Sequence, residues 1–409
     1  MHVLYLHQHF CSPDGASGTR SYEMARRLVQ AGHQVTMVCS SANLPGVGGE
    51  APVTRLELDG IRVVALNVAY SNRQSYAQRI RAFARFALGS TRVACAAENV
   101  DVVFATSTPL TIAYPGVKAK RRHRCPMVFE VRDLWPELPI AVGALRDPVT
   151  KCAARRLERW AYRNAEHVVA LSPGMRDGVA RTGYPTERIT VIPNGSDIGL
   201  FRVDAAEGRR FLDAHPYLAG GPLVTYTGVL GPVNGVEFMA DIAAAIARIA
   251  PDVRFAIIGD GKERERILSH ARGLGVLERN LWVLPPVSKT MVPAALAASS
   301  IACSFLIDLP ALEASCPNKV FDAFAAGKPV LVSYGGWIAD LLDESGAGIR
   351  VSRTDAEAAA SRLSALLSDS GALRRAGQAA AKLADERFDR DLLAGSLRRV
   401  LESVVERGS

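Results

Sequence analysis

Residues 301–332 read IACSFLIDLPALEASCPNKVFDAFAAGKPVLV. Their hydrophobic pattern predicts a buried strand at 301–306, a polar loop, a short helix and a second strand at 329–332. Pro317 suits the start of the helix because it has no N–H to leave unsatisfied, and Gly327 marks the helix end. A strand–loop–helix unit of this kind presents free backbone N–H groups and a partial positive charge to an anion in the loop.

The first turn of this helix carries side chains that suit a nucleotide sugar. Lys319 follows Asn318 and adds a full positive charge, and Asp322 lies one turn further on. The ammonium would bind a diphosphate, and the carboxylate would accept hydrogen bonds from sugar hydroxyls. The alternative is an exposed i,i+3 Lys–Asp pair on an ordinary crossover helix, worth about 0.2–0.5 kcal/mol. The spacing alone leaves both interpretations open.

Length and composition predict two domains of a globular α/β enzyme. The chain has 409 residues, of which 48% are hydrophobic and 22% charged, so each half is long enough for its own core. The net charge of +8 favours anionic ligands or an anionic surface. Zinc-finger spacing, an aromatic–basic RNA motif and zipper heptads do not occur, so we expect no nucleic-acid partner.

The cysteines and the first residues favour a cytoplasmic protein. Seven cysteines are scattered without a C-x-x-C pair, which argues against a disulfide framework or a structural zinc. The N-terminal MHVLYLHQHF lacks a basic region and a long apolar run, so it predicts a first strand and not a signal peptide. An apolar run of about 18 residues does not occur either, so we expect no membrane-spanning helix.

The first half opens with a strand–glycine loop–helix–strand unit, the unit of doubly wound sheets. A strand at 2–6 leads into a loop with Gly18, followed by a helix at 21–30 and a strand at 35–38. The loop lacks G-x-G-x-x-G, and no acid ends the second strand, which disfavours a dinucleotide site. Gly18 allows close approach of a ligand to the backbone, or it serves the turn alone.

A charged segment follows the strand predicted at 127–131. It reads EVRDLWPE, residues 130–137. Ligands of open parallel sheets bind at the carboxyl ends of the strands, where packing explains two carboxylates and a guanidinium poorly. Glu130, Arg132 and Asp133 are therefore candidate catalytic residues that handle sugar hydroxyls or a leaving phosphate. The alternative is a structural ion pair between Arg132 and an acid.

Two basic stretches bear on membrane contact. Residues 71–94 predict an amphipathic helix with arginines at 79, 81 and 85, and a second cluster, KAKRRHR, follows at 118–124. A basic amphipathic helix is typical of a peripheral membrane protein, where each charge adds about 1 kcal/mol at an anionic leaflet. The alternative is a helix that packs its apolar side on the sheet and leaves a solvated basic face.

The second half repeats the α/β pattern. A strand at 223–227 leads into the loop GVLGPVNG at 228–235, and a strand at 253–258 ends in Gly259-Asp260-Gly261. Glycine before a helix N-terminus again suits a phosphate.

In this order the motifs resemble a GT-B-fold glycosyltransferase of family 4 over nearly the whole chain. The carriers are Gly18, EVRDLWPE (130–137), IPNG (192–195), GVLGPVNG (228–235), GDG (259–261) and CPNKVFDAFAAGKPV (316–330). The pairing of EVRDLWPE with a PNK-type helix is similar to a bacterial O-antigen or capsule subgroup that includes fucosamine and N-acetylhexosamine transferases.

The resemblance implies an α/β fold of two doubly wound Rossmann-like domains that face each other across a cleft. It implies an N-terminal acceptor domain (1–197), a C-terminal nucleotide-sugar domain (198–388) and a last helix (389–409) that returns to the first domain. It implies retaining transfer from a nucleoside-diphosphate sugar, with UDP as the expected nucleotide and with neither a metal nor another cofactor. The acceptor is a glycan or a lipid-linked molecule, and peripheral contact with an anionic membrane fits that role.

The resemblance also assigns donor-binding positions, and it shows where this sequence departs from the family's motifs. The candidates are Gly18, Gly228, Gly231, Asn234, Gly261, Asn318, Lys319 and Asp322. Asp322 matches the second acid of the family's paired-glutamate motif and would hold the ribose, whereas the first acid falls at Ala314, one place from Glu313. The family's arginine and lysine for the diphosphate fall at Val229 and Asn234, which leaves Lys319 and helix N-termini for the phosphate charge. Arg132 replaces a histidine of the family's N-terminal site.

Two other classes remain as alternatives. A nucleotide-sugar 2-epimerase of the same fold would need no acceptor, so product analysis with donor alone separates it. A two-domain sugar-binding receptor would need an export signal.

Overall fold

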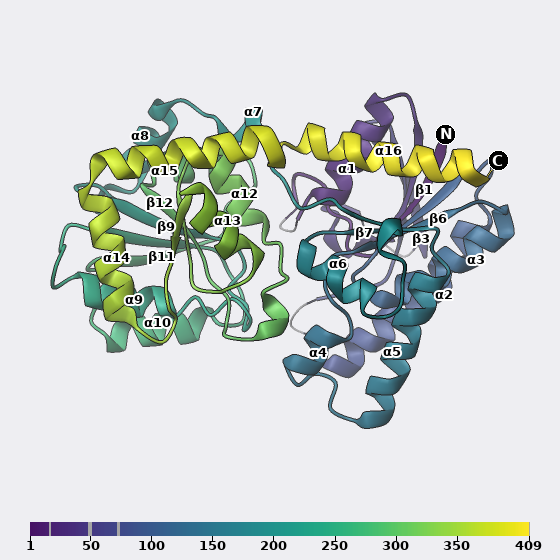
Figure 1. Ribbon diagram of the computed structural model, residues 1–409, viewed down its shortest axis with the longest axis horizontal. Helices are drawn as coiled ribbons and strands as arrows, with labels where there is room; N and C mark the ends of the chain where they lie inside the picture. Colours follow the sequence, from purple (N-terminus) through teal and green to yellow (C-terminus); the bar gives the residue numbers. More distant parts are fainter. Residues whose placement is uncertain (16–17, 48–50, 72–73, 409) are drawn as a thin grey trace. The chain divides into compact units, whose positions relative to one another are not determined.

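The computed structural model describes residues 1–15, 18–47, 51–71 and 74–408 (Figure 1). The chain forms two compact units: unit 1 comprises Met1–Pro193, Ala314–Cys316 and Asp391–Ser409, and unit 2 comprises Asn194–Glu313 and Pro317–Arg390. The boundaries expected from the sequence lay after residues 197 and 388. The described part of the chain contains no helix that is both long enough and apolar enough to cross a membrane.

Unit 1 is built on an eight-stranded sheet with the order β3-β4-β2-β1-β5-β6-β7-β8. Among the described strands, β3 and β4 pair antiparallel and the other neighbours pair parallel. The strands are β1 (His2–Leu6), β2 (Gln34–Ser40), β3 (Val53–Leu58), β4 (Ile61–Leu66), β5 (Val102–Thr106), β6 (Met127–Val131), β7 (His167–Ala170) and β8 (Ile189–Val191).

The hairpin of β3 and β4 was not expected from the sequence. Asp59 and Gly60 join the two strands with φ values of 49° and 79°. Positive φ at both central residues is what a type I′ turn needs, and Asp-Gly is a preferred pair there. The Asp-Gly dipeptide was therefore an available signal for an antiparallel edge on the sheet.

Helices cover both faces of the unit 1 sheet (Figure 1). Buried side chains of α1 and α16, among them Leu28 and Leu397, share one core with Val3 and Tyr5 of β1. On the other face α3 approaches so closely that a Cβ on Gly116 would lie 2.9 Å from the Met127 sulfur. The helices are α1 (Arg20–Gln30), α2 (Tyr76–Cys95), α3 (Ala113–His123), α4 (Glu137–Ala141), α5 (Pro148–Arg163), α6 (Pro173–Ala180) and α16 (Arg390–Gly408).

Unit 2 has a six-stranded parallel sheet with the order β11-β10-β9-β12-β13-β14. The strands are β9 (Leu223–Thr227), β10 (Arg254–Ile258), β11 (Leu281–Leu284), β12 (Ile301–Ser304), β13 (Val330–Val332) and β14 (Gly348–Arg350). The helices are α7 (Ile198–Phe201), α8 (Ala205–Ala214), α9 (Phe238–Ile246), α10 (Arg264–Gly273), α11 (Val292–Ala298), α12 (Asn318–Ala325), α13 (Trp337–Ser345), α14 (Ala356–Ser368) and α15 (Ser370–Leu383). The predicted strand–helix–strand unit at 301–332 is thus confirmed as β12, α12 and β13.

The strand orders fix where ligands bind. In unit 1 the order reverses between β1 and β5, and in unit 2 it reverses between β9 and β12. Connections diverge to opposite faces at such a switch point, which opens a crevice at the carboxyl ends of the strands. The Gly228 loop follows β9 and α12 follows β12, so both flank the switch point of unit 2.

The two ends of unit 2 are tied together. The Arg390 guanidinium donates to the Gly195 carbonyl oxygen at 2.8 Å and pairs with the Asp197 carboxylate. The Ser196 N–H donates to the Phe388 carbonyl oxygen at 3.0 Å, and the Arg390 N–H donates to the Ser196 carbonyl oxygen at 3.2 Å. These bonds explain why unit 2 extends from Asn194 to Arg390 and not over the narrower range expected.

Candidate active site

Lys319 lies beside the glycine loop of unit 2. Pro317 is the N-cap of α12, and Lys319 stands in the first turn. Its ammonium donates to the Tyr226 hydroxyl at 2.8 Å and lies 4.2 Å from the centre of that ring. A Cβ on Gly228 would lie 3.2 Å from Lys319 Cε and 3.4 Å from Nζ. The structure therefore brings together the cation and the loop that the sequence singled out separately.

Burial changes the chemistry of the Lys319 amine. It lowers the pKa of Lys319 from 10.5 to about 7. Within the described chain the Tyr226 hydroxyl is its hydrogen-bond partner, and no carboxylate pairs with it. Burial without a counter-ion disfavours the charged form, and an anion within a few ångströms would restore it. The site is therefore electrostatically suited to a diphosphate.

Asp322 is already engaged by protein groups. Its carboxylate is 6% exposed, and its Oδ1 accepts a hydrogen bond from the Ser196 hydroxyl at 2.8 Å. Lys289 Nζ lies 2.5 Å from Oδ2 and 4.7 Å from the centre of the Phe201 ring. The expected hydrogen bond from Asp322 to a ribose would therefore require these partners to move. The structure corrects the expectation that this carboxylate is open to a ligand.

The glycine loop after β9 is shaped mainly by close backbone approaches. Asn234 Nδ2 donates to the Val229 carbonyl oxygen at 2.9 Å, which closes the loop around Gly231. A Cβ on Gly261 would overlap the Leu230 carbonyl, because the loops after β9 and β10 run against each other. Packing thus accounts for Gly261 and for the Asn234 amide. Gly228 is exposed beside Lys319 and keeps its place as a candidate ligand contact.

Asn318 and Glu313 border the same region of unit 2. Asn318 is the half-exposed first residue of α12. Glu313 is exposed, and its Oε1 would lie 3.1 Å from a Cβ on Gly335. Ala314, where the family's first acid is expected, instead accepts a hydrogen bond from the Ser172 hydroxyl through its carbonyl oxygen at 2.6 Å.

Glu130 is buried in an ion pair in unit 1. Its side chain has no exposed surface. Its Oε1 accepts hydrogen bonds from Arg20 Nε and Nη2 at 3.0 and 2.9 Å, and Oε2 accepts one from the Thr106 hydroxyl at 3.1 Å. Arg20 also donates to the carbonyl oxygens of Ile192 and Pro193. A carboxylate enclosed in this way cannot touch a substrate, so the expected catalytic role of Glu130 is wrong and its role is structural.

Arg132 pairs with a histidine and not with an acid. Its Nη1 lies 3.2 Å from His7 Nε2, and its N–H donates to the Ser107 hydroxyl at 3.0 Å. Arginine is always a donor, so His7 Nε2 accepts. Burial, then Arg132 and His9, lower the pKa of His7 well below 6.5. His7 is therefore neutral, and its buried Nδ1 has no hydrogen-bond partner among the described residues.

Asp133 and Gln8 add polar groups to the same end of the unit 1 sheet. Burial raises the pKa of Asp133 to about 6, opposed by Arg132 and by a hydrogen bond from the Thr108 side chain. The Gln8 side chain is fully buried, and within the described part of the chain neither polar atom of its amide has a hydrogen-bond partner. Buried polar groups normally have hydrogen-bond partners, so we expect a ligand or water to bind the amide and His7 Nδ1. Gly18 is half-exposed and directly precedes Thr19, the N-cap of α1.

Several of these residues were missed in the sequence. Arg20 and Tyr226 lie far along the chain from their partners, so no local pattern indicated them. Lys289 stands in a loop whose composition carries no motif. His7 and Gln8 end the first predicted strand, and polar residues at the carboxyl end of an apolar strand were a usable signal.

The chain matches two described domain families. Residues 15–195 match the Glycosyl transferase 4-like domain, and residues 221–369 match Glycosyl transferases group 1. Solved structures with the same fold include Anabaena HepE in complex with UDP and glucose, with a TM-score of 0.73 and 20% identity over 98% of this chain and 99% of that one. Sucrose-phosphate synthase of Thermosynechococcus elongatus has a TM-score of 0.77 at 16% identity, with 99% of both chains covered.

Sequence relatives carry glycosyltransferase and synthase names. The D-inositol 3-phosphate glycosyltransferase of Nocardia farcinica is 27% identical over 64% of this chain, and the match spans 58% of that protein. The like-named enzyme of Segniliparus rotundus is matched over 42% of its length. A glycogen synthase of Mycobacterium tuberculosis is 24% identical over 94% of this chain and 90% of that one.

Fold and domain matches together define the class: the chain has the GT-B fold, and two segments that together span most of it match glycosyltransferase domain families. More particularly, its first domain is of the 4-like type and its second is of the group 1 type. These matches give no support to the epimerase alternative.

Proposed function

We propose that this protein transfers a sugar, with retention of anomeric configuration, from a nucleoside-diphosphate sugar bound by unit 2 to a hydroxyl of an acceptor held by unit 1. The observation that carries the proposal is Lys319: a partly buried ammonium that no described carboxylate pairs with, in the first turn of α12 and against the Gly228 loop. UDP is the favoured nucleotide, because HepE of the same fold was solved with UDP and glucose.

In the proposed reaction the bond between the sugar C1 and the diphosphate oxygen breaks. The acceptor oxygen forms its bond to C1 on the same face, through an oxocarbenium-like state, and the hydroxyl proton passes to the departing phosphate. Charge develops on the diphosphate, so fixed positive charge there lowers the barrier. Lys319 and the N–H groups of α12, which Asn318 begins, supply that charge. The rest of catalysis is positioning of the acceptor.

The proposed acceptor site is the polar cluster of unit 1. Arg132 is held by His7, while Asp133 and the Gln8 amide remain available for sugar hydroxyls. Gly18, before the N-terminus of α1, lets a ligand approach the backbone of the same unit. A glycan or a lipid-linked sugar of bacterial surface polysaccharide, such as O-antigen or capsule, is the acceptor class that the motif resemblance favours.

We further propose peripheral contact with an anionic membrane at the inner face of the cell through α2. Arg81 and Arg85 are exposed on this helix, and Ile80 and Leu88 are 47% and 62% exposed beside them. Interleaved basic and apolar side chains are what an interfacial helix presents.

Transfer is tested with a panel of UDP- and GDP-sugars and glycan or lipid-linked acceptors, with the anomeric configuration of the product read by NMR. We expect product with UDP donors, at least about tenfold less with Lys319→Ala, and unchanged rates with Lys382→Ala, an exposed lysine of α15. An altered sugar formed from donor alone would refute transfer. Equal rates for Lys319→Ala and wild type would remove Lys319 from the mechanism.

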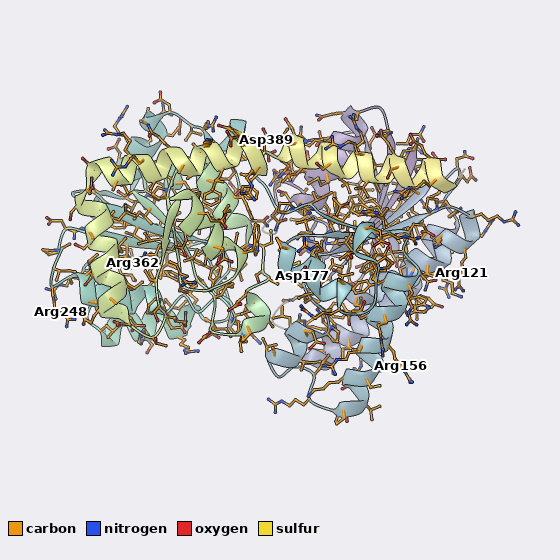
Figure 2. The ribbon with its side chains drawn as sticks, viewed as in Figure 1. Arg121, Arg156, Asp177, Arg248, Arg362 and Asp389 are labelled. Atoms are coloured by element: carbon orange, nitrogen blue, oxygen red, sulfur yellow. The ribbon has the colours of Figure 1, made fainter. Side chains whose placement is uncertain are left out.

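Membrane contact is tested by flotation with vesicles that contain anionic lipid. Binding should fall with Arg81→Glu and Arg85→Glu and stay unchanged with Arg362→Glu on α14 of unit 2, which Figure 2 labels. Absence of flotation by the wild type at low salt would defeat this proposal.

A further inference from the structure

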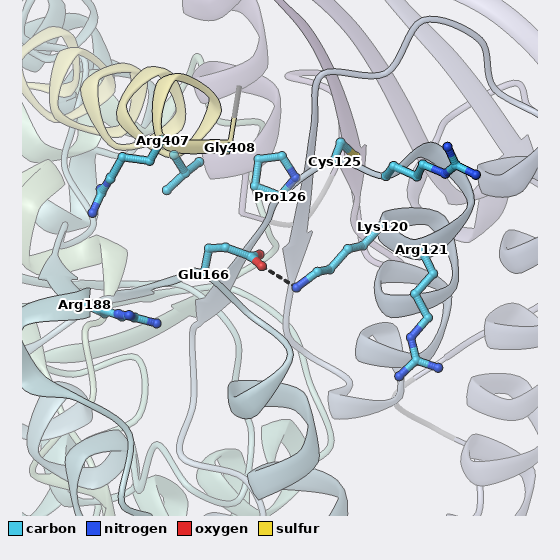
Figure 3. Close-up of a pocket in the computed structure, with 10 residues that line it drawn as sticks. Lys120, Arg121, Cys125, Pro126, Glu166, Arg188, Arg407 and Gly408 are labelled. Atoms are coloured by element: carbon cyan, nitrogen blue, oxygen red, sulfur yellow. Dashed lines mark hydrogen bonds and ion pairs between the residues drawn. The ribbon is translucent and has the colours of Figure 1, made fainter.

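A basic cavity lies in unit 1 at the amino ends of β6, β7 and β8. It has a volume of about 570 Å³ and is lined by Lys120, Arg121, Arg124, Cys125, Pro126, Glu166, Arg188, Val404, Arg407 and Gly408. Figure 3 shows Lys120 and Glu166 pointing toward each other within it. Its cations come from α3, from the loop before β8 and from α16, so no single element accounts for their convergence.

The charges in this cavity do not balance. Glu166 is the one carboxylate among the lining residues, and it pairs with Lys120. Its other oxygen accepts the Met127 N–H at 2.7 Å. The four arginines form no ion pair with any described carboxylate; Arg407 donates only to Ser403. The lining therefore carries a surplus of four positive charges.

The pKa of a neighbouring histidine is lowered by this surplus of positive charge. His167 is the first residue of β7 and is 7% exposed. Its Nε2 forms a hydrogen bond with the Thr190 hydroxyl at 2.8 Å. Burial, then Arg407 and Arg188, lower the pKa of His167 to about 4. Both arginines thus act on one buried group, so their charges converge in space and are not dispersed over the surface.

The structural alternative explains only part of the cluster. Basic residues at the end of α3 complement the helix dipole, which accounts for Arg121 and Arg124 without a ligand. Arg407 stands in the last turn of α16 and also complements a helix dipole, but Arg188 precedes a strand, and the dipoles do not explain why cations from three elements meet in one cavity. Like charges brought together without a counter-ion repel each other, and an anion would relieve that repulsion.

The volume sets the size of the ligand. Cavities of about 300–1,000 Å³ hold small molecules, whereas one phosphate would leave most of this space empty. Arginine is the preferred partner of phosphate, through paired N–H···O bonds. The cavity lies at the amino ends of the strands, opposite the carboxyl ends that bear His7 and Arg132, so it is separate from the acceptor cluster.

We propose that this cavity binds a phosphate-bearing ligand, either a soluble phosphorylated metabolite or the phosphate headgroup of a lipid, between Arg188 and Arg407 on one side and the end of α3 on the other. Both sources share the multiply charged phosphate that the four arginines recognise. The proposal is independent of the donor site in unit 2.

The soluble source is tested by calorimetric titration with pyrophosphate. We expect a site that survives Lys319→Ala and weakens at least about tenfold in an Arg188→Ala/Arg407→Ala variant, since that variant removes two charged hydrogen-bond donors for phosphate. Both arginines are exposed, so their truncation should leave the unfolding temperature unchanged. Arg156→Ala, an exposed arginine of α5 labelled in Figure 2, is the matched control.

The lipid source is tested by flotation with phosphatidylcholine vesicles with and without phosphatidic acid. Loss of phosphatidic-acid-dependent flotation in the double variant, with pyrophosphate binding absent from the wild type, supports the lipid headgroup. Pyrophosphate binding lost in the double variant supports the soluble metabolite. If the double variant matches the wild type in both experiments, the proposal is wrong. Loss of binding in Lys319→Ala alone would likewise refute it and assign the pyrophosphate to the donor site.

Discussion

Donor affinity should fall steeply as the pH rises through neutrality, because Lys319 loses its charge there. Its pKa is lowered to about 7 by burial. A diphosphate that binds the protonated amine then competes with deprotonation, so the apparent affinity follows the protonated fraction. That fraction is about 0.9 near pH 6 and about 0.03 near pH 8.5. The apparent affinity should therefore fall about 30-fold over this range, which corresponds to about 2 kcal/mol.

The assay is calorimetric titration of a UDP-sugar at intervals of pH, repeated in buffers of different ionisation enthalpy. Above neutrality the wild type should take up close to one proton per donor bound. Lys319→Arg keeps its charge throughout the range, so its affinity should be nearly independent of pH. Lys319→Ala should bind weakly, also with a flat profile. The reasoning is refuted if the wild-type affinity is constant, or if Lys319→Ala shows the same slope as the wild type.

The same shift affects the stability of the ligand-free protein with a defined sign. The folded-state pKa of Lys319 lies below its unfolded value of 10.5, so the unfolded chain binds more protons between about pH 7 and 10.5. Stability must then rise with pH in this window. The cost of the buried charge is fully present below about pH 7.

The remaining predictions concern the buried groups around the two sites. Glu130→Gln should lower the free energy of unfolding by about 3–5 kcal/mol in urea denaturation, because it leaves the Arg20 guanidinium buried and unpaired; a loss below 1 kcal/mol would contradict the structural role. The pKa of Asp133 is raised to about 6. The free-energy cost of its ionised carboxylate in the folded protein is therefore absent below about pH 4 and present above about pH 6. Asp133→Asn should therefore stabilise the protein by about 1–3 kcal/mol at neutral pH but not in acid, while it slows transfer. Gly261→Ala should lower the free energy of unfolding by about 1–3 kcal/mol, because the new Cβ overlaps the Leu230 carbonyl. An unchanged unfolding midpoint would show that the loops after β9 and β10 move apart at little cost.

Much of the fold follows from the sequence because parallel strands and their helices leave strong periodic signals. β1, β6 and β9 were predicted with their observed bounds, and α12 begins where Pro317 indicates. The β3–β4 hairpin was missed because β3 is a half-exposed edge strand, and such strands lack a continuous apolar run.

The site was less predictable because its contacts join distant parts of the chain. Motif spacing located Lys319 and Gly228 separately, but only the fold, which places the Lys319 ammonium on the Tyr226 hydroxyl of β9, shows that they lie together. The same spacing marked Glu130 as catalytic, since nothing near it in sequence reveals that Arg20 encloses it. The partners of Asp322 were missed for the same reason, because Lys289 approaches its carboxylate from a loop without a motif.

The contacts of Arg390 with Gly195 and Asp197 have a consequence for how this protein can be divided into fragments. Residues that enter and leave unit 2 sit side by side, bridged at Ser196 and Asp389. A segment whose two ends adjoin can be excised and closed with a short glycine-rich linker, because the closure spans little distance. Residues 194–390, which include Ala314–Cys316 of unit 1, should thus form a segment that can be produced alone and exchanged between related chains, together with the proposed nucleotide site.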